Sequence, residues 1–194
     1  VSNVGIPKQV KGTKVYLRVY AVGSNNDTTE TYRFMYETKN GEACAAVPSA
    51  AIALLYRVQL NTLQMTSFSF TPYVDFKNFN TELMIDSTYD LRLEARTNNA
   101  GNDFAAWIDF NNNLVFESSE RILYTQNKGL RDTARFTVPS WVNPNDTVLM
   151  RARIGMVHNP LLPCGNMLGQ VHDYSIVFKD VTTTLKEDLI SSSS

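Results

Sequence analysis

The sequence predicts an all-β protein: an antiparallel β-sandwich, jelly-roll-like, with an N-terminal β-hairpin extension. Two observations favour this fold class. Most apolar segments alternate with polar residues and are rich in β-branched and aromatic side chains, and Asn, Asp, Gly or Pro bounds nearly all of them. About nine such segments occur, more than one small sheet holds, so two packed sheets are expected.

The first two expected strands form a hairpin. Segments 14–21 and 31–37 alternate in this way and flank a polar turn at residues 23–27. Residues 1–42 are therefore expected to be a separate hairpin unit, either an edge extension of the sandwich or the end of a preceding module.

The remaining strands are expected in residues 43–181, the sandwich domain. One turn of helix is expected at residues 50–56, where Ser49 is a candidate N-cap before a run of good helix formers. The serine-rich end, residues 182–194, is expected to be a linker or tail. The expected strands, in chain order, are 55–60, 67–70, 88–95, 103–109, 133–138, 147–154 and 174–178.

Composition restricts the classes of partner. Of 194 residues 43% are hydrophobic and 19% charged, which suffices for a buried core. Eighteen Lys and Arg against 19 Asp and Glu leave a net charge of −1, too little positive charge to bind nucleic acid or anionic lipid by its field. No apolar stretch is long enough to span a bilayer. We expect neither nucleic-acid binding nor membrane insertion.

The sequence contains none of the common catalytic motifs. Its histidines are His158 and His172, and neither lies in a metalloprotease, serine-hydrolase or phosphate-loop pattern. Cys164 and His172 are the residue types of a catalytic cysteine–histidine dyad, but a loop histidine beside a disulfide explains the pair more simply. We therefore expect no enzymatic activity.

An Asn-rich segment follows Trp107 and contains the strongest candidate site. Its oxygen-bearing groups have the spacing of a twelve-residue calcium loop, positions 1, 3, 5, 7, 9 and 12, with a backbone carbonyl at position 7. Leu114 takes position 6, where glycine normally supplies a positive φ, and a left-handed backbone there would cost about 1–2 kcal/mol. The alternative is a hairpin turn capped by Asn side chains, without a metal. The candidate calcium ligands are Asp109, Asn111, Asn113, Val115, Glu117 and Glu120.

Aromatic residues suggest an alternative function, a carbohydrate-binding module with sugar stacked on an exposed ring. Trp107 lies on an alternating strand and is expected in the core. Trp141 lies in the Pro-bounded turn 139–144 and is the better candidate for an exposed, ligand-binding ring. The partner would then be a glycan.

Five short motifs, in the same order along the chain, resemble those of the GEVED domain over about residues 43–180. They are YVDF at 73–76, DSTYDL at 86–91, WIDFNNNLVFESSER at 107–121, LMRARI at 149–154 and GQVHDY at 169–174. In the family the last of these is GEVEDY. Gly169, Asp173 and Tyr174 match it, whereas Gln170 and His172 stand in place of the family's two glutamates.

The resemblance implies a noncatalytic structural or adhesion accessory module of a secreted or cell-surface multimodular protein. Its partners would be the neighbouring modules and a surface protein or glycan, and its location extracellular. It also implies metal at Asp109, Asn111 and Asn113. If the family's glutamates complete a cation site or a salt-bridge network, this member has lost two of its negative charges there.

The two cysteines, Cys44 and Cys164, are compatible by count alone with either one disulfide or two separate buried thiols. The resemblance places them at the family's opening and at its Cys-Gly pair. It therefore implies a disulfide between them, which an oxidising extracellular environment favours and which contributes about 2–5 kcal/mol.

Overall fold

The computed structural model describes residues 14–22, 28–37, 43–97, 101–156 and 161–180. The predicted linker or tail at 182–194 lies outside these ranges. The chain divides into two compact units, residues 1–42 and residues 43–194, and each is described by itself.

The first unit contains a β-hairpin. Strand β1 (Lys14–Val22) pairs with β2 (Thr28–Glu37) in antiparallel register, with a shift between Val19 and Tyr20. These strands confirm the predicted hairpin. Its role, as an edge extension or as the end of a preceding module, stays a prediction.

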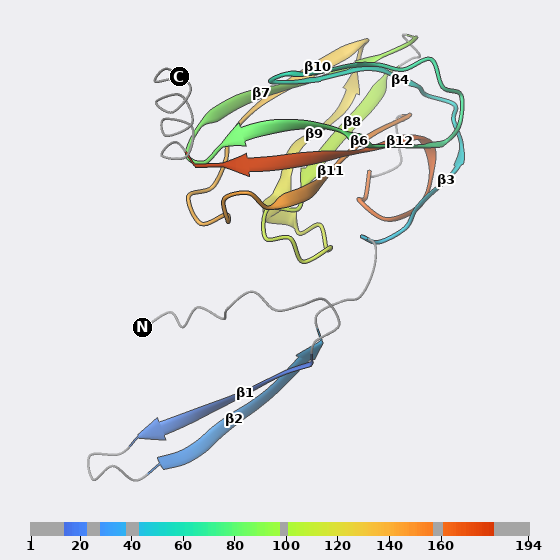
Figure 1. Ribbon diagram of the computed structural model, residues 1–194. Helices are drawn as coiled ribbons and strands as arrows, with labels where there is room; N and C mark the ends of the chain where they lie inside the picture. Colours follow the sequence, from blue (N-terminus) through green and yellow to red (C-terminus); the bar gives the residue numbers. More distant parts are fainter. Residues whose placement is uncertain (1–13, 23–27, 38–42, 98–100, 157–160, 181–194) are drawn as a thin grey trace, which may run out of the picture. The chain divides into compact units, whose positions relative to one another are not determined.

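The second unit is a β-sandwich of two sheets, shown as two layers in Figure 1. The smaller sheet has the order β10-β7-β4-β5, and all its pairs are antiparallel. It consists of β4 (Leu55–Leu60), β5 (Leu63–Thr66), β7 (Thr88–Ala95) and β10 (Arg131–Thr137). The predicted all-β sandwich is thus confirmed.

The larger sheet has the order β3-β12-β11-β8-β9, and β6 pairs with β12 as well. A short 3-10 helix, Ser118–Glu120, precedes β9. The strands are β3 (Ala46–Ala50), β6 (Tyr73–Met84), β8 (Asn102–Ile108), β9 (Arg121–Lys128), β11 (Thr147–Met156) and β12 (Gly165–Lys179).

Four details differ from the sequence prediction. Strands β3, β6 and β9 are missing from the expected strands. Strand β12 pairs in parallel with β3 and with β6, so the larger sheet is mixed, because alternation along a strand says nothing about the direction of its neighbours. The helical turn expected at residues 50–56 is wrong: β3 ends at Ala50 and β4 begins at Leu55. Residues 67–70 are not a strand, and the preceding residues 63–66 form β5 instead.

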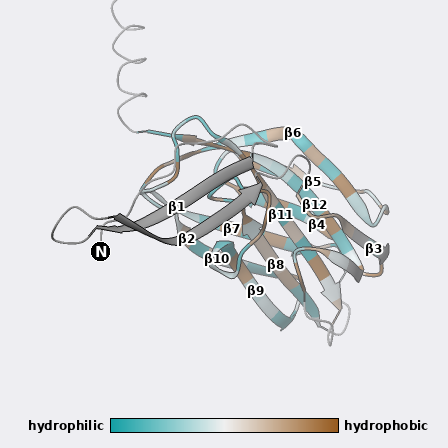
Figure 2. Cartoon of the chain, turned by 90° about the horizontal axis from the view of Figure 1, so that it is seen from below, coloured by the Kyte–Doolittle hydropathy of each residue, from teal (hydrophilic) through white to brown (hydrophobic). Residues whose placement is uncertain are grey.

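The main core lies between the sheets. Alternate residues of β4 and β7 point into it, such as Val58 and Leu60 of β4 and Leu91 and Leu93 of β7. Figure 2 shows hydrophobic and hydrophilic residues mixed along the strands of this unit. A second, smaller cluster covers the opposite face of the larger sheet and consists of Ala105, Trp107, Phe116 and Leu161. Strands β8 and β11 are therefore buried on both faces, and side chains on their outer face, including charged ones, are removed from water.

In the described ranges there is no helix with the length and apolar character needed to cross a membrane.

Candidate functional site

The Asn-rich segment forms a loop between β8 and β9, and its backbone has the conformation that the calcium-loop spacing requires. Leu114, at position 6, has φ 67°, the left-handed conformation expected there. Asn112 is left-handed too, with φ 54°. For a leucine this conformation costs about 1–2 kcal/mol, so the hydrogen bonds of the loop must compensate for it.

Asp109 organises the first half of the loop from a fully buried position. Its Oδ1 accepts a hydrogen bond from the Asn113 amide at 3.0 Å, and its Oδ2 accepts one from the Leu114 amide at 2.9 Å. Burial raises the pKa of Asp109, although the amide donors oppose this effect. A buried carboxylate thus holds the strained turn in place.

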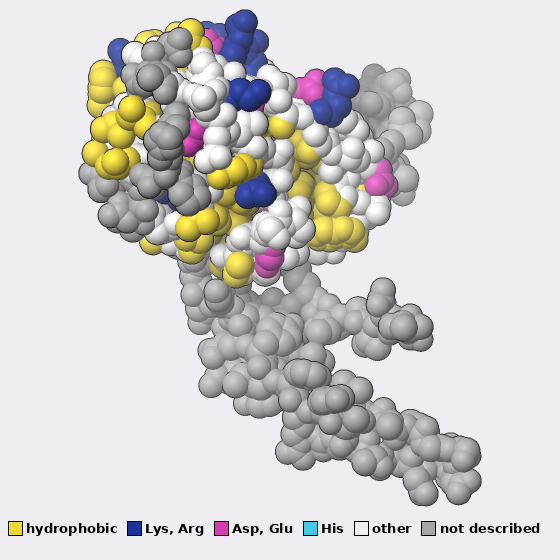
Figure 3. Space-filling model, turned by 180° about the vertical axis from the view of Figure 1, so that it is seen from behind, with side chains coloured by type: hydrophobic (Ala, Val, Ile, Leu, Met, Phe, Trp, Pro, Cys, Tyr) yellow, Lys and Arg dark blue, Asp and Glu magenta, His cyan; other side chains and the backbone are white. Residues whose placement is uncertain are grey.

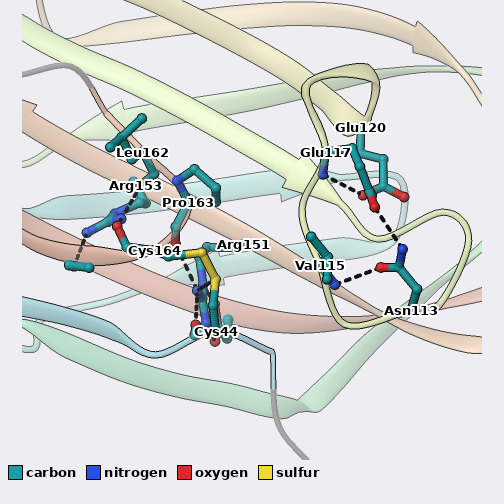
Figure 4. The surroundings of a disulfide bond; sticks show 12 residues. Cys44, Asn113, Val115, Glu117, Glu120, Arg151, Arg153, Leu162, Pro163 and Cys164 are labelled. Atoms are coloured by element: carbon teal, nitrogen blue, oxygen red, sulfur yellow. Dashed lines mark hydrogen bonds and ion pairs between the residues drawn. A yellow bond between two sulfur atoms is a disulfide. The ribbon is translucent and has the colours of Figure 1, made fainter. Parts of the chain in front are cut away.

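Glu117 and Glu120 form the second half, with their carboxyl groups facing each other, as Figure 4 shows. Glu120 is 2% exposed and accepts hydrogen bonds from the amides of Asn111 at 3.2 Å and Glu117 at 3.1 Å. Burial and the hydrogen bond to Glu117 raise the pKa of Glu120 to about 8. Burial acts against ionisation of Glu117 too, but hydrogen bonds from Glu120 and Asn113 lower its pKa.

The two asparagines connect these halves. Asn113 accepts from the Val115 amide at 2.7 Å and donates to Glu117 Oε1 at 2.7 Å (Figure 4), and Asn111 donates to Glu117 Oε2 at 3.4 Å. The structure thus brings the predicted ligand side chains into one hydrogen-bonded cluster. These are Asp109, Asn111, Asn113, Glu117 and Glu120.

The oxygen atoms of these side chains are of the chemical type that a hard cation prefers, because carboxylate and amide oxygens are the usual ligands of calcium. In the conformation described, both asparagine amides present N–H groups to Glu117, and each would have to rotate to offer its oxygen. Among the described residues there is no group of three or more Asp, Glu, His or Cys side chains arranged to hold a metal ion. Within the same ranges, no lysine or arginine forms an ion pair with Asp109, Glu117 or Glu120.

A second buried polar group lies on the same sheet, where Asp173 of β12 pairs with Arg151 of β11. Both oxygens of Asp173 accept from Arg151 at 2.7 Å, and one also accepts from the Tyr73 hydroxyl at 3.0 Å. Both charged side chains are almost completely buried. Sequence reasoning did not find Arg151 or Tyr73. The available signal was the alternation of two arginines, 151 and 153, in an otherwise apolar strand.

Arg151 also connects this ion pair to the disulfide and to the Asn-rich loop. It donates to the backbone oxygens of Cys44 at 2.7 Å and Pro163 at 2.8 Å, and its guanidinium lies 5.2 Å from the centre of the Phe116 ring. Cys44 and Cys164 form the predicted disulfide, with 5.6 Å between their Cα atoms (Figure 4). One arginine thus joins the start of the unit, its disulfide and the loop.

Arg153 has a similar anchoring role. It is fully buried, and it donates to the backbone carbonyls of Leu162, Cys164 and Gly165. Burial and the neighbouring Arg151 lower its pKa to about 10. It fixes the segment that contains the second cysteine.

Gln170 and His172, the two neutral substitutions in the motif, do not lie at the loop. Gln170 is fully buried; it accepts from the Leu55 amide at 2.9 Å and donates to the carbonyls of Ser69 and Thr71. A carboxylate could not make the last two bonds. The prediction of His172 as a loop residue is wrong: it lies in β12 and is buried in the main core. Its Nδ1 is 3.0 Å from the Tyr174 hydroxyl, and burial lowers its pKa to about 3. Of the motif's acidic positions, Asp173 alone retains a carboxylate, in an ion pair.

The aromatic candidates divide as predicted. Trp107 is buried in the smaller cluster, whereas Trp141 is 61% exposed. The Trp141 ring meets Phe110 edge-on, with 6.5 Å between centroids. The linings of the two surface hollows between β5 and β6 do not include it.

Together these features define a disulfide-closed, all-β sandwich module in which buried charged residues connect the closing motif to an acidic loop. Residues 103–177, which span that loop and that motif, match the family model of the GEVED domain. The chain thus contains a GEVED domain, as the sequence resemblance indicated. No curated protein sequence matches the chain.

Proposed function

We propose that this unit is a noncatalytic structural or adhesion accessory module of a secreted or cell-surface multimodular protein, and that the loop 109–120 binds one calcium ion. Calcium would stiffen the loop and stabilise the sandwich. Its ligands would come from Asp109, Asn111, Asn113, the Val115 carbonyl, Glu117 and Glu120.

The observation that carries the calcium proposal is the hydrogen-bonded cluster that joins Asp109, Glu117 and Glu120 through Asn111 and Asn113, in which none of the three carboxyl groups forms an ion pair with a described lysine or arginine. A plain Asn-rich turn explains the backbone contacts of Asp109, but it leaves the carboxyl groups of Glu117 and Glu120 facing each other (Figure 4). A divalent cation would compensate the charge of these groups.

The proposal of a noncatalytic role is supported by the structural use of the reactive groups. His172 is packed in the core, both cysteines form the disulfide, and Asp173 is paired with Arg151. On the face of the molecule seen in Figure 3, basic and acidic side chains are interspersed among neutral and hydrophobic ones. Such a surface favours neither a phosphate backbone nor an anionic membrane as a partner.

The extracellular location is supported by the disulfide, because such bonds persist in oxidising compartments. The proposed partners are the neighbouring modules of the parent protein.

Thermal melting with calcium and with a chelator tests the calcium proposal. At a calcium concentration a hundredfold above the dissociation constant, binding adds about 2.7 kcal/mol to the free energy of unfolding. For a unit of this size we expect the melting midpoint to rise by roughly 5–10 °C. Magnesium should have a smaller effect, since it prefers a more rigid octahedral site.

The variant Asp109→Asn should remove the calcium response. Asp90→Asn is the matched control, because Asp90 is an exposed carboxylate paired with Arg135, far from the loop in the sequence. An unchanged midpoint in millimolar calcium, or an equal response in Asp109→Asn, would leave the loop as a metal-free turn.

A further inference from the structure

A groove with a mixed polar and apolar lining runs between β5 and β6, at one side of the sandwich. Figure 2 shows the two strands side by side. The groove consists of two adjoining hollows of about 510 and 590 Å³, whose linings share Thr62 and Asn80. Each hollow has a volume in the range of small-ligand sites, about 300–1,000 Å³.

A bulge in β6 shapes this groove. In the parallel pairing with β12, Tyr174 lies opposite Phe76 and the next residue, Ser175, lies opposite Asn80. Residues 77–79 are therefore extra and leave the ladder. Phe79 is 51% exposed and lines the groove, and its ring meets Phe76 edge-on at 6.0 Å. Bulges of this kind redirect side chains, and this one places an aromatic ring in a groove that apolar residues such as Leu63 and Met65 line as well.

The lining is neutral and rich in amide and hydroxyl groups. Among the described residues, the side chains of Thr66, Asn78 and Asn80 have no hydrogen-bond partner, and all three are exposed. The charged residue of the lining is Glu82, which pairs with Lys179 at 3.3 Å. The groove therefore offers hydrogen-bond donors and acceptors beside a ring, with no net charge for an ionic ligand.

These features match a sugar. A pyranose has hydroxyl groups for amide side chains and an apolar face for an aromatic ring, and it carries no charge. An added peptide strand fits less well, because it needs consecutive free backbone groups along an edge. Strand β5 has four residues, and the bulge interrupts β6.

We propose that the β5–β6 groove is a binding site for a neutral oligosaccharide, with Phe79 stacking on a sugar ring and Asn78 and Asn80 hydrogen-bonding its hydroxyls. This site is separate from the calcium loop and does not depend on it. It also differs from the single exposed ring of Trp141 that sequence reasoning favoured.

Saturation-transfer NMR and calorimetry on the intact chain test the proposal, with neutral hexasaccharides of glucose, mannose, xylose and N-acetylglucosamine as probes. We expect at least one probe to bind. Phe79→Ala and Asn80→Ala should each weaken it about tenfold or more, the loss that removal of a stacked ring or a good hydrogen-bonded contact produces. Both positions are exposed, so melting midpoints should stay close to that of the unaltered chain.

Phe68→Ala is the matched control, because Phe68 is 64% exposed but does not line the groove. It should bind the probe as the unaltered chain does, and so should Asp109→Asn, which separates this result from the calcium proposal. The proposal is wrong if no probe binds at about 1 mM, a dissociation constant at the weak end of specific recognition. Binding that survives Phe79→Ala, or that is lost in Trp141→Ala, would overturn it as well.

Discussion

His172 should make the sandwich sensitive to mild acid. Its ring is buried in the main core, packed edge-on against Phe76 and hydrogen-bonded through Nδ1 to the Tyr174 hydroxyl. Its Nε2 has no partner among the described residues. A proton on this ring would place a charge in the core, and burial therefore lowers its pKa to about 3 from the ordinary value of 6.5.

The sign and size of the effect follow from proton linkage. Between pH 6.5 and pH 3 the unfolded chain binds a proton at His172 and the folded chain does not, so stability falls as the pH falls through 6.5. Each pH unit in this window is worth about 1.4 kcal/mol. At about pH 4.5, two units below the ordinary pKa, His172 should have removed roughly 2.7 kcal/mol from the free energy of unfolding.

Urea unfolding of the unaltered chain and of His172→Asn, at pH 7 and at pH 4.5, measures this contribution. An asparagine amide reaches about as far as Nδ1 and can keep the bond to Tyr174, but it does not titrate. At pH 7 the variant should be less stable by about 1–2 kcal/mol, because it fills less of the core. At pH 4.5 the difference should change by roughly 2.7 kcal/mol in favour of the variant.

Taking the difference between the two proteins cancels the carboxylates and His158, which both proteins share. Tyr174→Phe is a further control, since it removes the hydroxyl and keeps the buried ring, and its pH dependence should resemble that of the unaltered chain. An equal stability difference at both pH values would show that His172 titrates alike in the folded and unfolded states. The assignment of this ring to the core would then be wrong.

Three further substitutions test the buried motif and the loop by urea unfolding. Asp173→Asn should lower the free energy of unfolding by about 3–5 kcal/mol, because it leaves the buried Arg151 without its counter-charge. A loss below about 1 kcal/mol would mean that water reaches the pair. Gly169→Ala should lower the free energy of unfolding by at least about 2 kcal/mol, because the added Cβ would lie 1.9 Å from the Ile154 carbonyl oxygen and the residue has φ 136°. An unchanged stability would contradict this close approach of β11 and β12. Leu114→Gly should change stability by less than about 1 kcal/mol, since relief of the left-handed strain offsets the flexibility of glycine, and a larger loss would mean that the leucine side chain contributes to packing.

Prediction from sequence succeeded where the signal was local. Strands such as β7 and β11 alternate clearly, and the loop spacing identified position 6, Leu114, as the place where a calcium loop needs a positive φ, which the structure shows. It failed where two local signals compete. The short apolar run at residues 50–56 is compatible with a helix and with a buried strand. Its first residue, Ala50, is a strand residue because β3 pairs with the distant β12.

The candidate site divides in the same way. The oxygen spacing of residues 109–120 is a property of consecutive residues, so the loop could be recognised without a structure. The ion pair of Arg151 and Asp173 joins residues 22 positions apart on neighbouring strands, and its burial depends on the second apolar cluster that covers the outer face of the larger sheet. A sequence pattern for a sheet with one solvated face does not anticipate such a cover.

The sequence by itself determined the all-β class, the hairpin, the acidic loop and the family motifs, because each depends on residues that are neighbours in the chain. Tertiary structure decided the parallel pairing of β12, the roles of Gln170 and His172, and the groove beside the bulge of β6. Each of these depends on which distant strand lies alongside, and therefore on how buried donors, acceptors and charges find partners when both faces of a sheet are covered.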